Sequence, residues 1–374
     1  MSKISKIEPI SVSYPEPNDN GSIRNLTLCR IETSDGIVGW GEAITMWPEA
    51  CRATEIMISA MSDLLIGRDP LDNGAIYKEI AARSWWYGPE GIASFARSAI
   101  DIALWDLRGK VSGQSLITML GGEVQSKIPV IASTHAFSEN LDHEVKKHAK
   151  YVEQGFTGIK IGLGKKGAAR LGYEFDRDVS FMKMLRESVG PKPDIMFDRG
   201  QHLQWDSSYA TKLTQEFEKY NLRWIEEPLE PWDTQGFKHL RKHCTTLVAT
   251  GERCWTTDQY RRLIDSGIVD VVGCDPGRVG GISGFRELIG LVEQSQVWFN
   301  AHAWSSAIIT AASLALSASS NRCLLFELKP IDNPMQNELV EQPFWHENGF
   351  ISPPDRPGLG VEVKDSVVNK YRMI

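Results

Sequence analysis

The chain has 374 residues, of which 42% are hydrophobic and 24% are charged, and its formal net charge is -7. This composition is that of a soluble globular protein, and the negative charge argues against a nucleic-acid partner, because phosphate binding needs a basic surface. The six cysteines show no CxxC spacing and no apolar stretch approaches a membrane span or a signal-peptide core, so we expect a reduced, cytoplasmic protein without a membrane partner.

The first 125 residues predict a mixed α+β domain. Strands are expected at residues 7–14, 26–32 and 37–42. The last two are predicted to form a hairpin around the turn Thr33-Ser34-Asp35-Gly36. Apolar residues at helical spacing then predict helices over residues 49–65 and 92–111, and Gly121-Gly122 ends this helical region.

From residue 127 onward, eight short β-rich runs alternate with longer amphipathic stretches. The runs cover residues 128–132, 158–161, 195–198, 224–227, 247–251, 269–274, 297–301 and 324–327. Such repeats predict a parallel sheet, and eight of them match a (β/α)₈ barrel. A doubly wound open sheet would need a GxGxxG turn, but Gly162-Leu163-Gly164 is followed by Lys165-Lys166, which we expect to be solvated surface lysines. The sequence therefore favours the barrel.

Acidic residues follow three consecutive predicted strands of this barrel: Asp198, Glu226 with Glu227, and Glu252. The carboxyl ends of barrel strands meet at one mouth. A single acid at such a place is more often a loop cap, but three in successive units form an oxygen-rich cluster of the kind that Mg²⁺ accepts. The sequence therefore predicts a Mg²⁺ site at the mouth.

Later strand ends predict acid–base chemistry at the same mouth. Asp275 and His302 follow neighbouring strands, where the carboxylate would fix the tautomer of the imidazole and raise its basicity. A lone histidine after an apolar run is more often structural, and its position beside Asp275 favours the catalytic interpretation. Lys160, on the second strand, faces the site from the opposite side, where it would hold a carboxylate oxygen or exchange a proton.

Five segments carry a family resemblance that extends over nearly the whole chain. They are ALWDLRGK at residues 103–110, GFTGIK at 155–160, WIEEP at 224–228, GE at 251–252 and DPGRVGG at 275–281. Together they resemble the enolase superfamily, in its mandelate racemase group. The resemblance implies an α+β capping domain over a modified (β/α)₇β TIM barrel. We place the capping domain at residues 1–125, the barrel at 126–352 and a C-terminal segment that returns to the capping domain at 353–374.

The resemblance also assigns roles to residues. It implies Asp198, Glu226 and Glu252 as Mg²⁺ ligands, His302 and Asp275 as the base dyad, and Glu327 as a hydrogen-bond donor to an enediolate intermediate. Two positions depart from the group. Gly162 stands where a second lysine of a Lys-x-Lys motif is common, and Asp198 is followed by Arg199-Gly200, with His202 two residues further on.

The expected activity is that of a lyase, a Mg²⁺-dependent acid-sugar dehydratase. It would remove the proton α to the carboxylate of an aldonic or aldaric acid and expel the β-hydroxyl, which gives a 2-keto-3-deoxy acid. His302 would act as base and then as acid, with Lys160 or His202 as alternative acids. Cycloisomerisation of a sugar-acid lactone is the main alternative. Racemisation is disfavoured because Gly162 removes one base, and a noncatalytic relative would not need the dyad.

Substrate contacts are expected from loops of the first domain that cover the mouth, at residues 14–24 and 83–88. The candidates are Arg24, Arg83, Trp85, His202 and Trp304. The aromatic residues are at least as well explained as packing between the domains. The expected partner is a small carboxylate, an acid sugar, and a homo-oligomer is expected because self-association is common for such folds.

Overall fold

An antiparallel sheet of three strands begins the chain. In the computed structural model, which describes residues 2–165, 167–302 and 304–374, strands β1 (Ile4–Glu16), β2 (Ser22–Thr33) and β3 (Val38–Met46) pair in chain order. The turn between β2 and β3 is closed by hydrogen bonds between Thr33 and Ile37, and Gly36 takes a φ of 85°, which favours glycine. The predicted hairpin is therefore confirmed.

Helices α1 (Pro48–Ala60), α2 (Asn73–Ser84), α3 (Ile92–Ser112) and α4 (Leu116–Met119) complete the N-terminal part. Helix α3 is buried along most of its length and packs directly on β3. A side chain at Gly41 would place its Cβ 2.6 Å from the backbone nitrogen of Ala103, so glycine permits this close approach. The predicted helix over residues 92–111 is confirmed, and the one over 49–65 ends earlier, at Ala60.

The second part of the chain alternates strands and helices as predicted. Within the described residues, eight strands run parallel, namely β4 (Ile128–His135), β5 (Gly158–Leu163), β6 (Asp194–Arg199), β7 (Leu222–Glu226), β8 (Leu247–Thr250), β9 (Val271–Cys274), β10 (Trp298–Ala301) and β11 (Phe326–Leu328). In the described part of the chain they are connected by seven helices, namely α5 (Leu141–Glu153), α6 (Phe175–Val189), α7 (Ser207–Glu218), α8 (Thr234–His243), α9 (Thr257–Asp265), α10 (Gly281–Glu293) and α11 (Ala307–Ala318). This is the (β/α)₇β arrangement.

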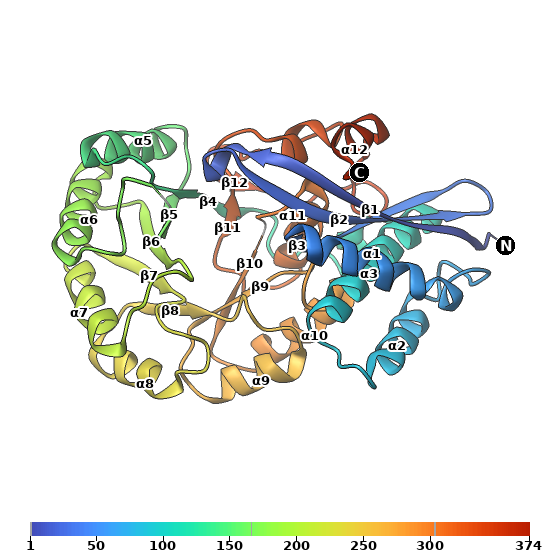
Figure 1. Ribbon diagram of the computed structural model, residues 1–374, viewed down its shortest axis with the longest axis horizontal. Helices are drawn as coiled ribbons and strands as arrows, with labels where there is room; N and C mark the ends of the chain where they lie inside the picture. Colours follow the sequence, from blue (N-terminus) through green and yellow to red (C-terminus); the bar gives the residue numbers. More distant parts are fainter. Residues whose placement is uncertain (1, 166, 303) are drawn as a thin grey trace.

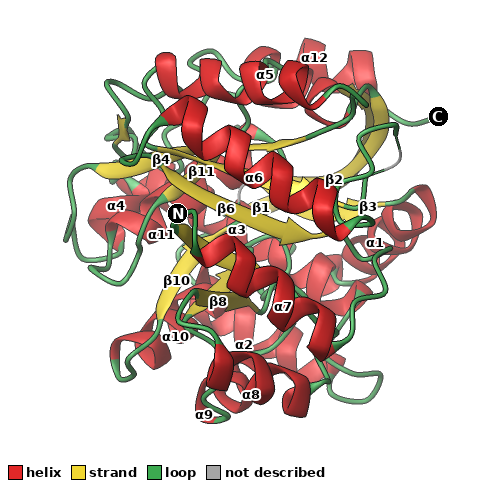
Figure 2. Ribbon diagram, turned by 90° about the vertical axis from the view of Figure 1, so that its left-hand side faces the viewer, coloured by secondary structure: helices red, strands yellow, loops and turns green. Residues whose placement is uncertain are grey.

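The strands curl into a barrel with the order β10-β9-β8-β7-β6-β5-β4-β11. Between β10 and β11 the contact is made by a parallel bridge from Phe299 to Cys323. Figure 1 shows α5 to α9 around the outer side of these strands, with the β1–β2 ribbon on the other side of the molecule. In the perpendicular view the strands lie between layers of helices (Figure 2). The helices thus leave the strand ends free for a site.

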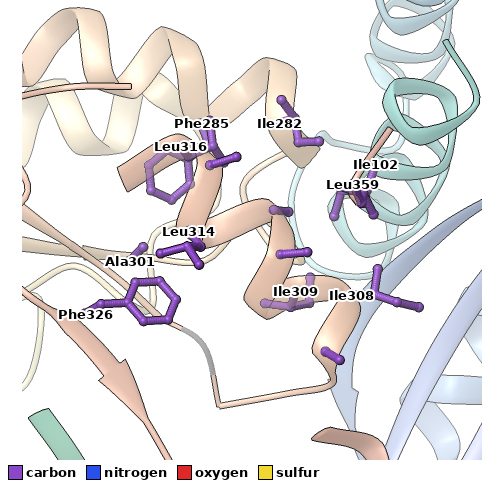
Figure 3. Packing of buried hydrophobic residues seen from close by; sticks show 14 of the residues in the cluster. Ile102, Ile282, Phe285, Ala301, Ile308, Ile309, Leu314, Leu316, Phe326 and Leu359 are labelled. Atoms are coloured by element: carbon purple, nitrogen blue, oxygen red, sulfur yellow. The ribbon is translucent and has the colours of Figure 1, made fainter. Parts of the chain in front are cut away.

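Helix α11 links the two parts through apolar contacts. All of its side chains are buried, because it lies between the barrel strands and the N-terminal part. Figure 3 shows Ile308 and Ile309 of this helix, with Phe326 of β11 on the barrel side. It also shows Leu359 of the C-terminal segment beside Ile102 of α3. The mouth of the barrel and the N-terminal sheet are therefore held in a fixed relation.

The C-terminal segment touches both parts. Strand β12 (Phe350–Ile351) pairs antiparallel with the start of β4, and helix α12 (Asp365–Tyr371) follows. The backbone nitrogen of Met373 donates to the carbonyl of Ser11 on β1 at 2.9 Å. The domain boundaries at residues 125 and 352 stay predictions. In the described part of the chain, no helix has the length and apolar character needed to cross a bilayer.

Candidate active site

Four residues at neighbouring strand ends lie at one level of the barrel. The strand register pairs His135 of β4 with Gly162 of β5, Gly162 with Asp198 of β6, and Asp198 with Glu226 of β7. Paired residues of parallel strands project to the same face of the sheet. Because Glu226 contacts the inward-pointing Lys160, this level faces the inside of the barrel at its carboxyl end.

Lys160 lies at the centre of the carboxylates. Its Nζ is 2.9 Å from Oε1 of Glu226, 2.8 Å from Oε1 of Glu327 and 3.8 Å from Oδ2 of Asp198. Burial alone would lower the pKa of Lys160, but these carboxylates raise it well above its ordinary value. In this arrangement the lysine is therefore a fixed cation.

The carboxylates outnumber the positive charge. Among the described residues, Glu252 and Glu327 act on both Asp198 and Glu226, and Lys160 is the cation that opposes them. Burial, with added repulsion from neighbouring carboxylates, raises the pKa of Asp198 to about 7 and that of Glu226 to about 8. Such an excess of buried negative charge is the condition in which a divalent cation is favoured.

The donor set fits Mg²⁺ in its chemistry. Asp198 and Glu226 are register partners, and Glu252 follows β8 and raises the pKa of both. Oxygen ligands from a few carboxylates, with water and substrate completing the shell, are what Mg²⁺ prefers. Within residues 2–165, 167–302 and 304–374, no three acidic, imidazole or thiol groups converge into a ready-made cage. Lys160 occupies the charge-balancing position instead.

The two neighbouring glutamates at the end of β7 face different ways. Glu226 points toward Lys160, whereas Glu227 accepts hydrogen bonds from the hydroxyl of Thr250 at 2.7 Å and the backbone nitrogen of Gly251 at 3.0 Å. Glu227 also pairs with Arg253 at 3.2 Å. Its φ of 47° marks the turn of the chain there. Glu227 thus fastens β7 to the β8 loop, and Glu226 is the one available to the site.

His302 and Asp275 form the expected pair. Nδ1 of His302 lies 2.6 Å from Oδ2 of Asp275, which is buried. The other carboxylate oxygen of Asp275 accepts a 2.7 Å hydrogen bond from the backbone nitrogen of Gly277. The DPG turn therefore orients the carboxylate, and the carboxylate orients the imidazole. With a proton on Nδ1 donated to Asp275, the lone pair of His302 is on Nε2.

Glu327 is the middle residue of β11, where it accepts hydrogen bonds from Lys160 and from the side-chain amide of Asn300. Burial by itself raises the pKa of Glu327, but the charges of Lys160 and His302 outweigh it and lower the pKa below its ordinary value. Here Glu327 is thus a hydrogen-bond acceptor. The resemblance implies that Glu327 donates a hydrogen bond. For that role Lys160 must release the Glu327 carboxylate, and the carboxylate must take up a proton.

The loop between β1 and β2 lies over the mouth. Asp19 in this loop pairs with Lys165 after β5 at 3.2 Å, and Asn18 donates to the carbonyl of Ile331 beyond β11 at 2.6 Å. Lys165 is therefore no ordinary surface lysine, which corrects the sequence interpretation, and Lys166 lies outside the described residues. Two contacts thus join this loop to the barrel.

Arg24 and Trp304 meet at the same rim. Nη1 of Arg24 donates to the carbonyl of Trp304 at 2.9 Å, and its guanidinium lies 5.1 Å from the Trp304 ring. Nζ of the buried Lys329 also lies 5.1 Å from the centroid of the Trp304 ring, and it pairs with Glu16 of β1 at 2.6 Å. Burial lowers the pKa of Lys329 to about 8. The predicted contacts Arg24 and Trp304 are thus brought together.

The structure does not bring every candidate into this group. Arg83 pairs with Asp63 at 2.8 Å on the exposed surface of the N-terminal part, and Trp85 is 74% exposed beside Trp86. This exposure argues against packing between the domains for the two tryptophans. His202 is exposed in the loop after β6. Their roles as substrate contacts stay predictions.

Sequence reasoning overlooked the end of β4. The strand was expected to stop at residue 132, but it continues through Ser133 and Thr134 to His135. Ser133 and His135 point inward, as their register partners Lys160 and Gly162 show. The signal was available, because Ser-Thr-His after an apolar run remains compatible with a strand.

The barrel, its cap and the carboxylate-rich mouth are features of one enzyme class, and comparison with known proteins identifies it. Residues 144–367 match the family described as Enolase C-terminal domain-like, and residues 8–121 match the Mandelate racemase / muconate lactonizing enzyme, N-terminal domain. The chain therefore belongs to the mandelate racemase and muconate lactonizing enzyme family of the enolase superfamily, as the sequence motifs predicted.

Relatives of this chain with a named activity include sugar-acid dehydratases. The chain is 31% identical over 307 residues to an L-talarate/galactarate dehydratase of Salmonella typhimurium, a match covering 82% of this chain and 72% of that protein. It is 29% identical to a D-galactonate dehydratase family member of Streptomyces bingchenggensis, over 93% of this chain and 90% of that one. Dehydratases of this kind are hydro-lyases, which agrees with the lyase class expected from the sequence.

A solved structure shows the same fold over the whole chain. The 3,6-anhydro-D-galactonate cycloisomerase from Zobellia galactanivorans superposes with a TM-score of 0.89 at 27% identity, covering 100% of both chains. Dehydratases and a cycloisomerase are therefore both among the proteins that this chain resembles.

Proposed function

We propose that the protein is a Mg²⁺-dependent dehydratase of an aldonic or aldaric acid. The observation that carries this proposal is the placement of the His302–Asp275 pair and the carboxylates Asp198, Glu226 and Glu252 at strand ends of one barrel mouth. Sugar-acid dehydratases among the relatives support the substrate class.

The first step is removal of the proton on the carbon next to the substrate carboxylate. Nε2 of His302 takes this proton, while Asp275 stabilises the resulting imidazolium through the 2.6 Å hydrogen bond to Nδ1. Asp198, Glu226 and Glu252 would hold Mg²⁺, which supplies positive charge against the negative charge that develops on the substrate carboxylate. Lys160, a cation at the centre of the site, contributes to the same stabilisation.

The second step is loss of the β-hydroxyl. The imidazolium of His302 returns its proton to the departing oxygen, so that water forms as the bond between the β-carbon and oxygen breaks. The electron pair left on the α-carbon becomes the new carbon–carbon double bond. The enol product then tautomerises to a 2-keto-3-deoxy acid. One residue thus serves as base and acid on the same face, a syn elimination.

A lactone cycloisomerase is the second candidate, because removal of the same proton followed by loss of a ring oxygen needs the same residues. The Zobellia cycloisomerase is the observation in its favour. We expect wild-type protein with MgCl₂ to convert at least one acid in a panel of aldonic and aldaric acids to a 2-keto acid. Conversion of lactones alone, with no free acid consumed, would establish the cycloisomerase instead.

A further inference from the structure

His135 is placed where the strand register meets the proposed metal ligands. It is the last residue of β4, and its register partner Gly162 is in turn the partner of Asp198. His135 therefore lies at the same level and on the same face of the sheet as Asp198. None of the steps proposed above uses His135.

Gly162 and His135 are complementary in shape. A side chain at residue 162 would place its Cβ 2.6 Å from Cε1 of His135 and still closer to Nδ1, which no real side chain tolerates. The imidazole thus fills the volume that a longer residue on β5 would need. The position of the His135 ring therefore favours glycine at residue 162, and the polar group at this place is the imidazole of His135.

The ring is held by packing and not by polar contacts. Its centroid lies 4.7 Å from the ring of Trp304, whose Nε1 donates to the hydroxyl of Ser133 at 2.8 Å. Neither ring nitrogen of His135 has a hydrogen-bond partner within the described ranges 2–165, 167–302 and 304–374, although both are shielded from solvent. Buried polar atoms without partners are costly, so a hydrogen bond from a ligand to either nitrogen would be favourable.

The surroundings of His135 keep it neutral. Burial and the positive charges of Lys165, Arg24, Lys160 and Lys147 lower its pKa well below its ordinary value. A neutral imidazole offers one N–H donor and one acceptor nitrogen, which matches a hydroxyl group. It would be a poor proton donor to a leaving group, so the acid role stays with His302.

We propose that His135 is a specificity-determining residue that binds a hydroxyl of the substrate chain beyond the carbon that loses its proton. This inference rests on the proposed function and names the feature that it selects, a polyhydroxylated acid. One ring nitrogen would donate a hydrogen bond to that hydroxyl or accept one from it, while Trp304 packs against the ring. Acids that lack such a hydroxyl gain nothing from this residue.

The test compares His135→Phe, which keeps a ring and removes both nitrogens, with His135→Gln, which keeps a donor and an acceptor. Each is combined with His302→Asn, so that ligands bind without reacting, and titrated calorimetrically in MgCl₂ with gluconate, galactonate, xylonate and lactate. His135→Phe should weaken binding of the polyhydroxy acids roughly 10- to 100-fold and leave lactate unchanged. His135→Gln should retain most of the affinity.

Two further variants guard against loss of folding. Gly162→Ala displaces the ring while His135 is intact, and it should weaken the same acids. His346→Phe is the control, because His346 is a buried histidine that accepts a hydrogen bond from the backbone of Gly349 near β12, away from the mouth. It should bind every acid as the parent does.

Equal affinities for His135→Phe and the His346→Phe control would overturn the inference, as would an equal loss for lactate and gluconate. In either case, 2-keto acid formation by the wild-type enzyme would leave the proposed function intact. If the wild-type enzyme neither consumes nor binds any polyhydroxy acid, the proposed function fails and the inference fails with it.

Discussion

Nδ1 of His302 lies 2.6 Å from Oδ2 of Asp275, although 27 positions separate the two residues along the chain. The contact exists because β9 and β10 are neighbouring parallel strands and each residue follows the end of its strand. The carboxylate is itself fixed by the backbone of Gly277. Asp275 thus holds the imidazole of His302 in one orientation. The first prediction tests His302 as the base.

Replacing the base should stop both steps. His302→Asn should reduce α-proton exchange with D₂O and dehydration by about 10² to 10⁴, and Mg²⁺ affinity should be unchanged because His302 is not a proposed ligand. Asp275→Asn should cause a smaller loss, since the imidazole remains but its tautomer is no longer fixed. NMR of solvent exchange and calorimetric Mg²⁺ binding measure these effects. Normal exchange in His302→Asn would contradict the assignment.

Lys160 tests which side of the site removes the proton. Because its pKa is raised by Glu226, Glu327 and Asp198, we expect it to stay a cation and to act through charge. Lys160→Met should lower turnover but leave measurable α-proton exchange. If exchange stops in Lys160→Met while His302→Asn only slows hydroxyl loss, the lysine is the base, the histidine is the acid and the elimination is anti.

Glu226, the last residue of β7, and Glu227, which follows it, provide a matched pair of variants for testing the metal site. Glu226→Gln should lose Mg²⁺ affinity and turnover, because Glu226 faces the carboxylate cluster. Glu227→Gln should keep Mg²⁺ affinity but lower the free energy of unfolding by about 1 to 3 kcal/mol, since its bonds to Thr250 and Gly251 are disturbed. Calorimetry with MgCl₂ and urea unfolding distinguish the two. Unchanged Mg²⁺ binding and turnover in Glu226→Gln would exclude it as a ligand.

Gly162 predicts reaction on one face. With glycine in place of a second lysine, and with the pKa of His135 lowered so that it binds a proton poorly, we expect the base among the described residues of the mouth to be His302. Wild-type enzyme in D₂O should therefore exchange the α-proton of one configuration of the acid only. NMR can measure the exchange of the α-proton for deuterium in each of two epimeric acids. Equal exchange for both epimers would revive the racemase interpretation.

A buried aspartate between the two parts of the molecule predicts pH-dependent stability. Asp101 of α3 accepts hydrogen bonds from Ser283 of α10, and burial raises its pKa to about 7. The folded state then holds this proton more tightly than the unfolded chain. Stability contributed by Asp101 is therefore full below about pH 4, falls by at most about 1.4 kcal/mol per pH unit, and is constant above about pH 7.

Asp101→Asn should remove this pH-dependent contribution to the free energy of unfolding. The wild type minus variant difference in the free energy of unfolding, measured by urea without Mg²⁺, should decrease between pH 5 and pH 8. Subtracting the variant cancels the carboxylates at the mouth, which titrate in the same range. A difference that is the same at both pH values would show that Asp101 is ionised in the folded state throughout.

The sequence by itself determined the architecture and most of the mouth. Repeated alternation of apolar runs and amphipathic stretches predicts a parallel barrel, and a parallel barrel brings all its strand ends together. Asp198, Glu226, Glu252, Asp275 and His302 could thus be predicted to share one mouth before any distance was known. Local periodicity suffices for this because it fixes where each strand ends.

Only the tertiary structure decided what those side chains touch. Of the two glutamates at residues 226 and 227, Glu226 is the one that faces inward. This follows from the φ of Glu227 and from the hydrogen bond that Glu227 accepts from Thr250 of the next strand. The charge balance at Lys160, and the complementarity of Gly162 and His135, follow from register between strands. Lys165 contacts the loop between β1 and β2 through Asp19, a residue of another part of the chain. These contacts depend on register and packing between distant segments, which no local pattern of residues specifies.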